Sequence, residues 1–411
     1  MAKFIEKWKS VSLIVKILIG IVIGAVLGVA FPSASAIGIL GTLFISALKG
    51  IAPILVFVLV MSAISKAGSG IGSQFRNVIF LYMLSTLIAA LIAVIVHFLF
   101  PLTVALSQPA SESSAPGSLS VIFGTLLTNI VENPISALAG ANYLGILFWA
   151  VIIGLGLKIA GNQTAIDAVD GFSNAISIVV GWVIQCAPFG ILGIVYTTVS
   201  GSGLSIFTSY GLLVLELVLT MLFVAFVSNP LIMFLCSREN PYPLVFRCIR
   251  ESAVSAFFTR SSAANIPVNM ALCEKLGLNR DFYSVSIPLG ATVNMDGAAV
   301  VITIMSLTLA HTIGVTVSIP TAIFLAIVST LSACGSSGVA GGSLLLIPMA
   351  CSMLGISNDI AMQMVGVGFI ISVIQDSTET ALNSSADVAF TATAEKMAKK
   401  SNYPGGNRYR S

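Results

Sequence analysis

The stretch Ile374-Gln-Asp-Ser-Thr-Glu-Thr-Ala-Leu-Asn-Ser-Ser-Ala-Asp387 follows an apolar run, yet it carries three acidic residues and no Lys or Arg. On an α-helix, at about 100° per residue, its main polar side chains share a stripe about 100° wide. The stripe consists of Asp376, Glu379, Thr380, Asn383 and Asp387.

An ionised carboxylate inside a bilayer costs about 3 kcal/mol or more unless it is paired, hydrated or bound to a cation. The stripe therefore needs a positive partner, which can be a metal ion, a substrate amine or the embedded Arg260. The alternative is a water-exposed helix end, which fits Asp387 better than Asp376, because Asp376 directly follows the apolar run.

Composition indicates a polytopic membrane protein. The 411 residues are 57% hydrophobic and only 9% charged, which is too apolar for a soluble globular protein. The net charge of +3 is spread along the chain, so nothing indicates nucleic-acid binding. The six cysteines lack CxxC spacing and predict neither a zinc site nor a disulfide framework. No small-residue cleavage site follows the first apolar segment, which we interpret as a retained span.

Apolar runs of the length that crosses a bilayer recur along the first part of the chain. We place six spans at residues 13–31, 37–65, 78–100, 143–159, 172–199 and 210–235. The second and fifth are over-long and must tilt or break, with Pro53 and Pro188 as the natural break points. The weaker piece at 121–138 predicts a partial or interfacial helix.

From Arg250 onward, polar residues, glycine and proline interrupt the apolar segments, which form four pieces at 251–274, 282–312, 319–354 and 360–393. The positive-inside rule keeps the basic residues cytoplasmic only if the first and third pieces are re-entrant, from opposite faces. The sequence thus predicts an all-α polytopic membrane protein with eight transmembrane helices, two re-entrant helical hairpins in inverted repeat, and cytoplasmic termini. Inverted repeats with interrupted helices are typical of secondary transporters, whose site lies near the midplane.

The first hairpin turns at residues 259–267, Thr-Arg-Ser-Ser-Ala-Ala-Asn-Ile-Pro, where free backbone NH groups can hold a substrate carboxylate. A small-residue packing seam is the alternative. The second hairpin turns at residues 334–343, Cys-Gly-Ser-Ser-Gly-Val-Ala-Gly-Gly-Ser, whose glycines suit a gate. A phosphate-binding loop would need a lysine there, and none is present.

Between the hairpins lies Gly290-Ala-Thr-Val-Asn-Met-Asp-Gly297. Asn294 and Asp296 are about 200° apart on a regular helix, so they share a site only if the helix unwinds. Unwinding would free carbonyl oxygens, and with these two side chains they form the all-oxygen environment that an alkali cation prefers.

Other polar residues of the spans give weaker signals. Tyr82, Ser85 and Thr86 recur at helical spacing, which alone is ordinary span polarity. The isolated histidines, His97 and His311, we interpret as structural. The sequence assigns no role to two acids, Glu132 and Glu216.

At these motifs the chain resembles the dicarboxylate/amino acid:cation symporters, which have the glutamate-transporter fold. The likeness covers nearly the whole chain, and it is strongest to the bacterial sodium-coupled serine/threonine transporter branch, through Thr-Arg-Ser-Ser-Ala-Ala-Asn-Ile-Pro and Glu-Thr-Ala-Leu-Asn-Ser-Ser. The resemblance implies a homotrimer in which a scaffold holds a sliding transport domain. The scaffold would be residues 1–76 and 101–207, the transport domain 77–100 and 208–394, and the cytoplasmic tail 395–411.

The resemblance also implies site residues. Asp376 would bind the substrate amino group, and Asn383 and Ser262 its carboxylate. The remaining lining residues would be Ser261, Ala298, Gly338, Val339, Glu379 and Thr380. The first sodium site would consist of Gly290, Asn294, Asn383 and Asp387. The second sodium site would consist of Thr292, Ala333, Cys334 and Ser336. The third sodium site would consist of Tyr82, Ser85, Thr86, Asn294 and Asp296. Apart from these coupling ions, no cofactor is expected.

Two departures from acidic-substrate members bear on the substrate. Glu379 stands where those members have an arginine, and Ala298 where they have a threonine. A substrate carboxylate side chain would meet a negative wall, whereas the hydroxyl of L-serine or L-threonine can donate to Glu379. We therefore predict sodium-coupled import of these amino acids across the bacterial inner membrane by an elevator mechanism. The alternative is a proton- or sodium-coupled carrier of dicarboxylates or other organic acids. A nucleophile, base and orienting group for an enzyme are not visible.

Overall fold

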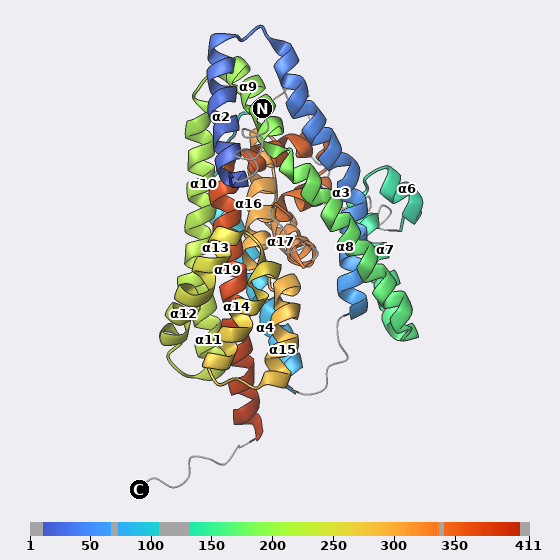
Figure 1. Cartoon of the computed structure of the whole chain (residues 1–411), viewed down its shortest axis with the longest axis vertical. Coiled ribbons are helices and arrows are strands. Elements are labelled where there is room, and N and C mark those ends of the chain that lie inside the picture. Colours follow the sequence, from blue (N-terminus) through green and yellow to red (C-terminus); the bar gives the residue numbers. More distant parts are fainter. Residues whose placement is uncertain (1–10, 67–72, 107–130, 335, 337–340, 403–411) are drawn as a thin grey trace.

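The computed structural model describes residues 11–66, 73–106, 131–334, 336 and 341–402, and all regular elements within these ranges are helices (Figure 1). Six helices in the described part are long and apolar enough to cross a membrane: 35–66, 74–99, 163–185, 206–237, 280–312 and 358–398. Large apolar side chains stay exposed on the outer helices, such as Val22, Leu99 and Ile159. Exposed apolar surface of this extent marks an interaction with lipid or protein, which agrees with the predicted all-α membrane protein.

One group of helices packs around α3 (Gly38–Lys66). It comprises α7 (Tyr143–Ala160), α8 (Gln163–Gln185) and α9 (Ala187–Ser202), and α2 (Leu13–Ala30) packs against α9. The expected break near Pro188 is confirmed, because α8 ends and α9 begins on either side of Cys186. The helix α3 instead continues through Pro53, so the break considered there is wrong. Of the predicted partial helix, residues 121–130 lie outside the described residues, residues 131–133 are not helical, and α6 (Pro134–Ala139) begins at Pro134.

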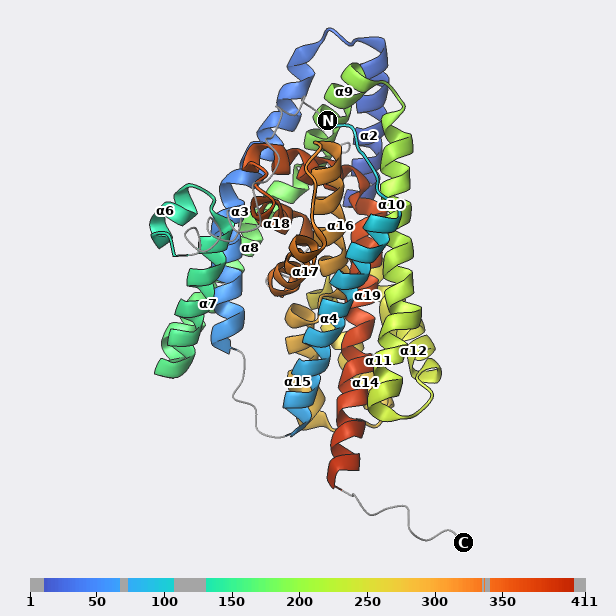
Figure 2. The ribbon, with the colours of Figure 1, turned by 180° about the vertical axis from the view of Figure 1, so that it is seen from behind.

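A second group forms around two buried helices, α16 (Asp296–Thr312) and α19 (Asn358–Asn402). Helix α4 (Ser73–Leu99) packs against both, and α10 (Ile206–Phe223) closes another side (Figure 2). A π-helical turn, η2 (Val224–Ser228), continues α10 into α11 (Asn229–Ser237).

Helix–turn–helix units occupy both positions where hairpins were expected. In the first, α12 (Tyr242–Cys248), η3 (Ile249–Ala253) and α13 (Val254–Thr259) form one arm and α14 (Ser262–Lys275) the other. The turn is shorter than the predicted 259–267, because α14 already begins at Ser262 and runs through Pro267. In the second, α17 (Ile319–Ala333) packs against η4 (Ser343–Leu346) and α18 (Ile347–Met353). A long helical segment follows each unit: α15 (Arg280–Val293) with α16, and α19.

Candidate functional site

The helix between the two hairpins is unwound where the sequence predicted it. Helix α15 ends at Val293, α16 begins at Asp296, and Asn294 (φ −89°, ψ 84°) is non-helical. Because of this break, Asn294 turns toward α19 while Asp296 turns toward α4. Both side chains are fully buried, so their polar atoms need partners inside the protein.

The first cluster, the Asp387 cluster, joins the break to α19. Asn294 Nδ2 donates to Asp387 Oδ1 at 3.0 Å and to the Asn383 carbonyl oxygen at 3.3 Å. The Tyr82 hydroxyl donates to the Asp387 carbonyl oxygen at 3.2 Å. Asp387 Oδ2 is buried and has no hydrogen-bond partner among the described residues. A buried carboxylate oxygen without a donor is unfavourable, and coordination of a hard cation would satisfy it.

Gly290 lies against this carboxylate, so the four residues of the first predicted sodium site are brought together. A Cβ atom at position 290 would lie 2.7 Å from Asp387 Oδ1 and 2.9 Å from the Tyr82 hydroxyl oxygen. Both distances are shorter than van der Waals contact. Only glycine therefore lets α15 approach α19 this closely.

We expect Gly290→Ala to weaken sodium binding, because the added methyl group displaces the Asp387 carboxylate. The sodium concentration for half-maximal uptake should rise about tenfold, which corresponds to about 1.4 kcal/mol. Transport of labelled substrate against sodium concentration measures it. Gly211→Ala is the matched control, since a Cβ there meets nothing within 4 Å. An unchanged sodium dependence in Gly290→Ala would contradict the assignment.

The second cluster surrounds Asp296. Ser85 Oγ and Thr86 Oγ1 donate to Asp296 Oδ1 at 2.9 and 3.1 Å. Each hydroxyl also lies within hydrogen-bond distance of the Tyr82 carbonyl oxygen, so the residues of the third predicted set lie together. Asn229, which the sequence analysis missed, donates from Nδ2 to Asp296 Oδ2 at 2.7 Å. Its only signal in the sequence is an amide within an apolar span, before Pro230.

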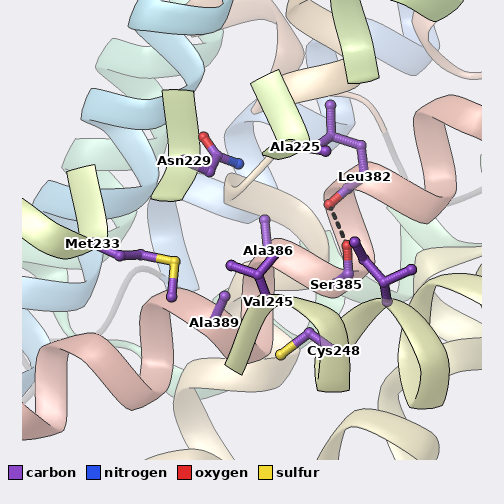
Figure 3. A pocket seen from close by; sticks show the side chains of 10 residues that line it. Ala225, Asn229, Met233, Val245, Cys248, Leu382, Ser385, Ala386 and Ala389 are labelled. Carbon is purple, nitrogen blue, oxygen red and sulfur yellow. Dashed lines mark hydrogen bonds between the residues drawn. The ribbon is translucent and has the colours of Figure 1, made fainter. Parts of the chain in front are cut away.

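Behind Asp296, Asn229 lines a cavity of about 20 Å³ between α11, α12 and α19 (Figure 3). That volume is enough for one water molecule. Ser385, which lines the pocket from α19, donates to the Leu382 carbonyl oxygen at 3.2 Å, and Asn229 Oδ1 has no partner among the described residues. The sequence did not predict this pocket beside the second cluster.

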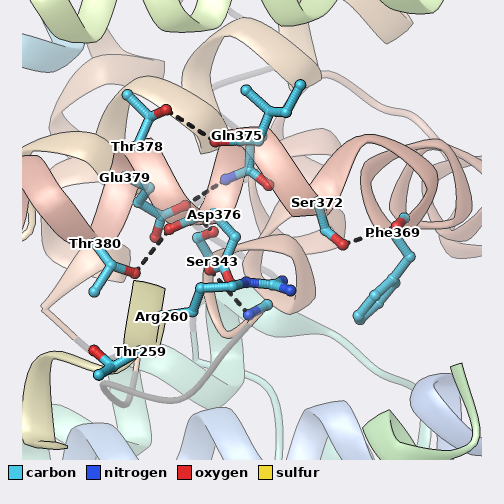
Figure 4. Close-up of polar contacts among 12 residues, drawn as sticks. Thr259, Arg260, Ser343, Phe369, Ser372, Gln375, Asp376, Thr378, Glu379 and Thr380 are labelled. Carbon is cyan, nitrogen blue, oxygen red and sulfur yellow. Dashed lines mark hydrogen bonds and ion pairs between the residues drawn. The ribbon is translucent and has the colours of Figure 1, made fainter. Parts of the chain in front are cut away.

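The third cluster, at Asp376, joins both hairpins to α19 (Figure 4). Arg260 Nε donates to Asp376 Oδ2 at 2.7 Å, and both side chains are buried. The Gly341 NH group donates to Asp376 Oδ1 at 3.1 Å. Arg260 (φ 52°) sits at the turn of the first hairpin and Gly341 (φ 74°) at that of the second. Of the partners considered for the acidic stripe, the structure thus shows the arginine.

Glu379 lies one turn further along α19. Its Oε2 accepts hydrogen bonds from Ser343 Oγ at 2.7 Å and from Gln375 Nε2 at 2.5 Å. The Thr380 hydroxyl donates to the Asp376 carbonyl oxygen at 2.8 Å. Asn383 Oδ1 accepts from the Gly297 NH group at 2.7 Å, beside the buried Ala298. All five stripe residues are buried, so the alternative of a water-exposed helix end is wrong.

The predicted residues of the first hairpin have different environments. Ser261 caps α14 by accepting from the Ala264 NH group, and Ser262 is buried. Deeper in the hairpin, Asn269 Nδ2 donates to the Ser384 carbonyl oxygen at 2.9 Å, and Asn265 Nδ2 to Ser384 Oγ at 2.8 Å. The sequence analysis did not assign these two amides, which attach the hairpin to α19.

The second predicted sodium set is only partly assembled. Cys334, at the end of α17, lies beside the helix break, with its Sγ 3.5 Å from the Val293 carbonyl oxygen. The Thr292 side chain is exposed and donates to the Leu289 carbonyl oxygen. Ala333 and Ser336 are buried next to Cys334. Gly338 and Val339 lie outside the described residues.

Comparison with known proteins identifies the family of this chain. The family model described as "Sodium:dicarboxylate symporter family" matches residues 13–397. A serine/threonine transporter, SstT, of Streptococcus agalactiae serotype III (strain NEM316) is 57% identical over 397 residues, 96% of this chain and 98% of the relative. The SstT of Bifidobacterium adolescentis is 57% identical over 388 residues, 94% of this chain and 90% of the relative. With its long apolar helices, the chain is a multi-pass membrane protein that belongs to the sodium:dicarboxylate symporter family.

Proposed function

We propose that this protein is a sodium-coupled symporter that imports L-serine and L-threonine across the bacterial inner membrane. The observation that carries the proposal is the Asp387 cluster, where a buried carboxylate oxygen without a partner lies beside Asn294 at a helix break. The names of relatives that are 57% identical over nearly their full length support the substrates. The acidic wall at Glu379 supports a neutral rather than an acidic amino acid.

The proposed architecture has eight crossings and two re-entrant hairpins in inverted repeat. The six long apolar helices, with α2 and α7, supply the crossings, and the two helix–turn–helix units supply the hairpins. Residues 1–76 and 101–207 would be the scaffold of a homotrimer, and residues 77–100 and 208–394 the elevator-like transport domain. Both termini, including the tail at 395–411, would be cytoplasmic.

Substrate binding would use the Asp376 cluster. The substrate ammonium group takes the place of the Arg260 guanidinium at Asp376, because both are hydrogen-bond donors with a positive charge. Asn383 and Ser262 would then receive the substrate carboxylate, and its hydroxyl would donate to Glu379 beside Ser343. Sodium at Asp387 would hold Asn294 and Asn383 in place, which couples the two sites.

Coupling to sodium is energetically sufficient for accumulation. One sodium ion moving down a tenfold gradient releases about 1.4 kcal/mol, and a potential of 100 mV adds about 2.3 kcal/mol. Together these can sustain a substrate ratio of several hundred, since each 1.4 kcal/mol is about tenfold.

Uptake of labelled serine into proteoliposomes, with a sodium gradient at fixed pH, tests the proposal directly. We expect uptake only with the gradient, and competition by unlabelled serine and threonine. If uptake does not require the sodium gradient and is inhibited by dicarboxylates, this result contradicts the proposal and favours a carrier of organic acids.

A second prediction concerns specificity at Glu379. We expect Glu379→Arg to lower serine uptake by about tenfold, because it removes the hydroxyl acceptor and places a positive charge near the ammonium site. Acidic amino acids should become better competitors. Glu379→Gln, which keeps the size of the side chain, should weaken serine uptake without admitting acidic substrates. Competition by a panel of amino acids measures both variants, and a profile unchanged from wild type would remove Glu379 from the pocket.

A further inference from the structure

A buried pair of titratable side chains lies apart from the three clusters. His97 Nδ1 of α4 lies 3.4 Å from Glu216 Oε1 of α10, and the side chains are 6% and 4% exposed. Neither carboxylate oxygen of Glu216 has a hydrogen-bond partner in good geometry among the described residues. The structure thus places His97, which we interpreted as structural, next to Glu216, to which the sequence assigned no role.

Within the part of the chain that the structure describes, few other ionisable groups lie near the pair. From α16, Thr308 Oγ1 lies 3.5 Å from His97 Nδ1, and the exposed His311 ring is 6.3 Å away between centroids. On α10, Tyr210 is the other titratable group, and its hydroxyl donates to the Ala105 carbonyl oxygen at 2.8 Å. Helix α17, which also packs on α4, has no ionisable side chain.

The acids of the proposed site contact α4 nearer its N-terminal end than His97 does. Asp296 contacts Thr86, which precedes His97 by about 16 Å of helix rise. Asp387 contacts Tyr82, which is one turn further from His97 on α4. Arg280 and Asp281 stand at the start of α15, more than two turns before Val293 at the helix break. The acids of α19 at positions 376 and 379 are held by the two hairpins. The pair is therefore well outside hydrogen-bond reach of the sodium and substrate clusters.

We infer that His97 and Glu216 form a proton-binding site whose occupancy controls transport. With one proton, taken from water, the pair is neutral overall, either as imidazolium and carboxylate or as imidazole and carboxylic acid. Loss of that proton leaves a carboxylate buried without a donor, which is strongly unfavourable. Binding and release of this proton would make the pair sensitive to the pH of the water that reaches it.

The direction of the effect follows from the charge. When the pair loses its proton, α4, α10 and α16 must admit water to the carboxylate, which loosens the packing that holds Ser85 and Thr86 against Asp296. Uptake is therefore highest with the proton bound and falls as the external pH rises. This inference goes beyond sodium-coupled import, which is tested at one fixed pH.

The first test is the pH profile of serine uptake into proteoliposomes at constant sodium gradient, from about pH 6 to 9. We expect wild-type uptake to fall by about fivefold or more as pH rises, and Glu216→Gln, which cannot release a proton, to lose this dependence while remaining sodium-driven. Asp281→Asn is the matched control, because its carboxylate is exposed on α15 and it should keep the wild-type profile. A profile that is the same in Glu216→Gln as in wild type would overturn the inference and leave the pair a structural one.

A second test does not depend on transport. The chain contains only two histidines, so His311→Gln, prepared without a histidine tag, leaves His97 as the single signal after histidine-selective isotope labelling. We expect this NMR signal to change with pH, and the change to be altered when Glu216→Gln is added. A signal that stays constant across the same pH range would overturn the inference, even if Glu216→Gln alone fails to fold.

Discussion

Replacement of Asp376 by asparagine should reduce serine uptake by about 10- to 100-fold, since a hydrogen bond to a charged group contributes about 1.5–3 kcal/mol. The variant removes the carboxylate that would bind the substrate ammonium group. It also leaves the Arg260 guanidinium buried without its partner at 2.7 Å. Initial rates of labelled serine uptake, at saturating sodium, measure the loss.

Asp376→Asn removes the carboxylate for the substrate amine and also leaves Arg260 unpaired. A second substitution, at Arg260, separates these two effects. In the double variant Asp376→Asn with Arg260→Gln, no unpaired charge remains, because both members of the pair are neutral. If Asp376 binds the substrate amine, the double variant stays inactive although its thermal stability recovers. Recovery of uptake in the double variant would show instead that Asp376 only neutralises Arg260. Size-exclusion chromatography of each variant checks that it is folded.

The acidic stripe could be predicted because it lies within a single continuous helix. Helix α19 runs from Asn358 to Asn402 without a break, so the angular positions of Asp376, Glu379 and Asp387 follow from their spacing alone. The unwound turn at Asn294 was predictable for a similar reason, since a regular helix cannot bring it and Asp296 to one site. Positions along one helix are local information, and the sequence carries it directly.

The partners of the stripe could not be predicted in the same way. Arg260 and Asp376 are 116 positions apart, and only the fold shows that the arginine reaches this carboxylate and not another. Asn265 and Asn269 resemble a small-residue packing seam until their amide groups are seen to donate to Ser384. The predicted turn at 259–267 was too long because proline was treated as its end, whereas α14 includes Pro267.

The same limit explains why His97 and Glu216 were read separately. Their pairing depends on the packing of α4 against α10, two helices far apart in the sequence. Lys49 of α3 likewise forms an ion pair with Asp359, at the start of α19. The role of a charged residue that stands alone in a span can be assigned only when its partner in the folded structure is known.

Asp387→Asn should abolish sodium-dependent uptake while the protein stays folded. The asparagine keeps the size of the side chain, but it loses the charge that would hold the cation beside Asn294 and the Asn383 carbonyl oxygen. Asn294 Nδ2 can still donate to the remaining oxygen, so the helix break itself should persist. Uptake and sodium-dependent thermal stabilisation should both fall to background, because the coupling ion no longer binds.

Asp281→Asn is the matched control for Asp387→Asn, since it makes the same chemical change at an exposed carboxylate on α15. We expect it to retain wild-type uptake and wild-type stabilisation by sodium. Sodium could still raise the thermal stability of Asp387→Asn when lithium and potassium at equal ionic strength do not. That result would place the coupling ion at another site. In that case Asp296, which accepts three hydrogen bonds from Ser85, Thr86 and Asn229, is the next carboxylate to replace, because it is the other buried acid at the helix break.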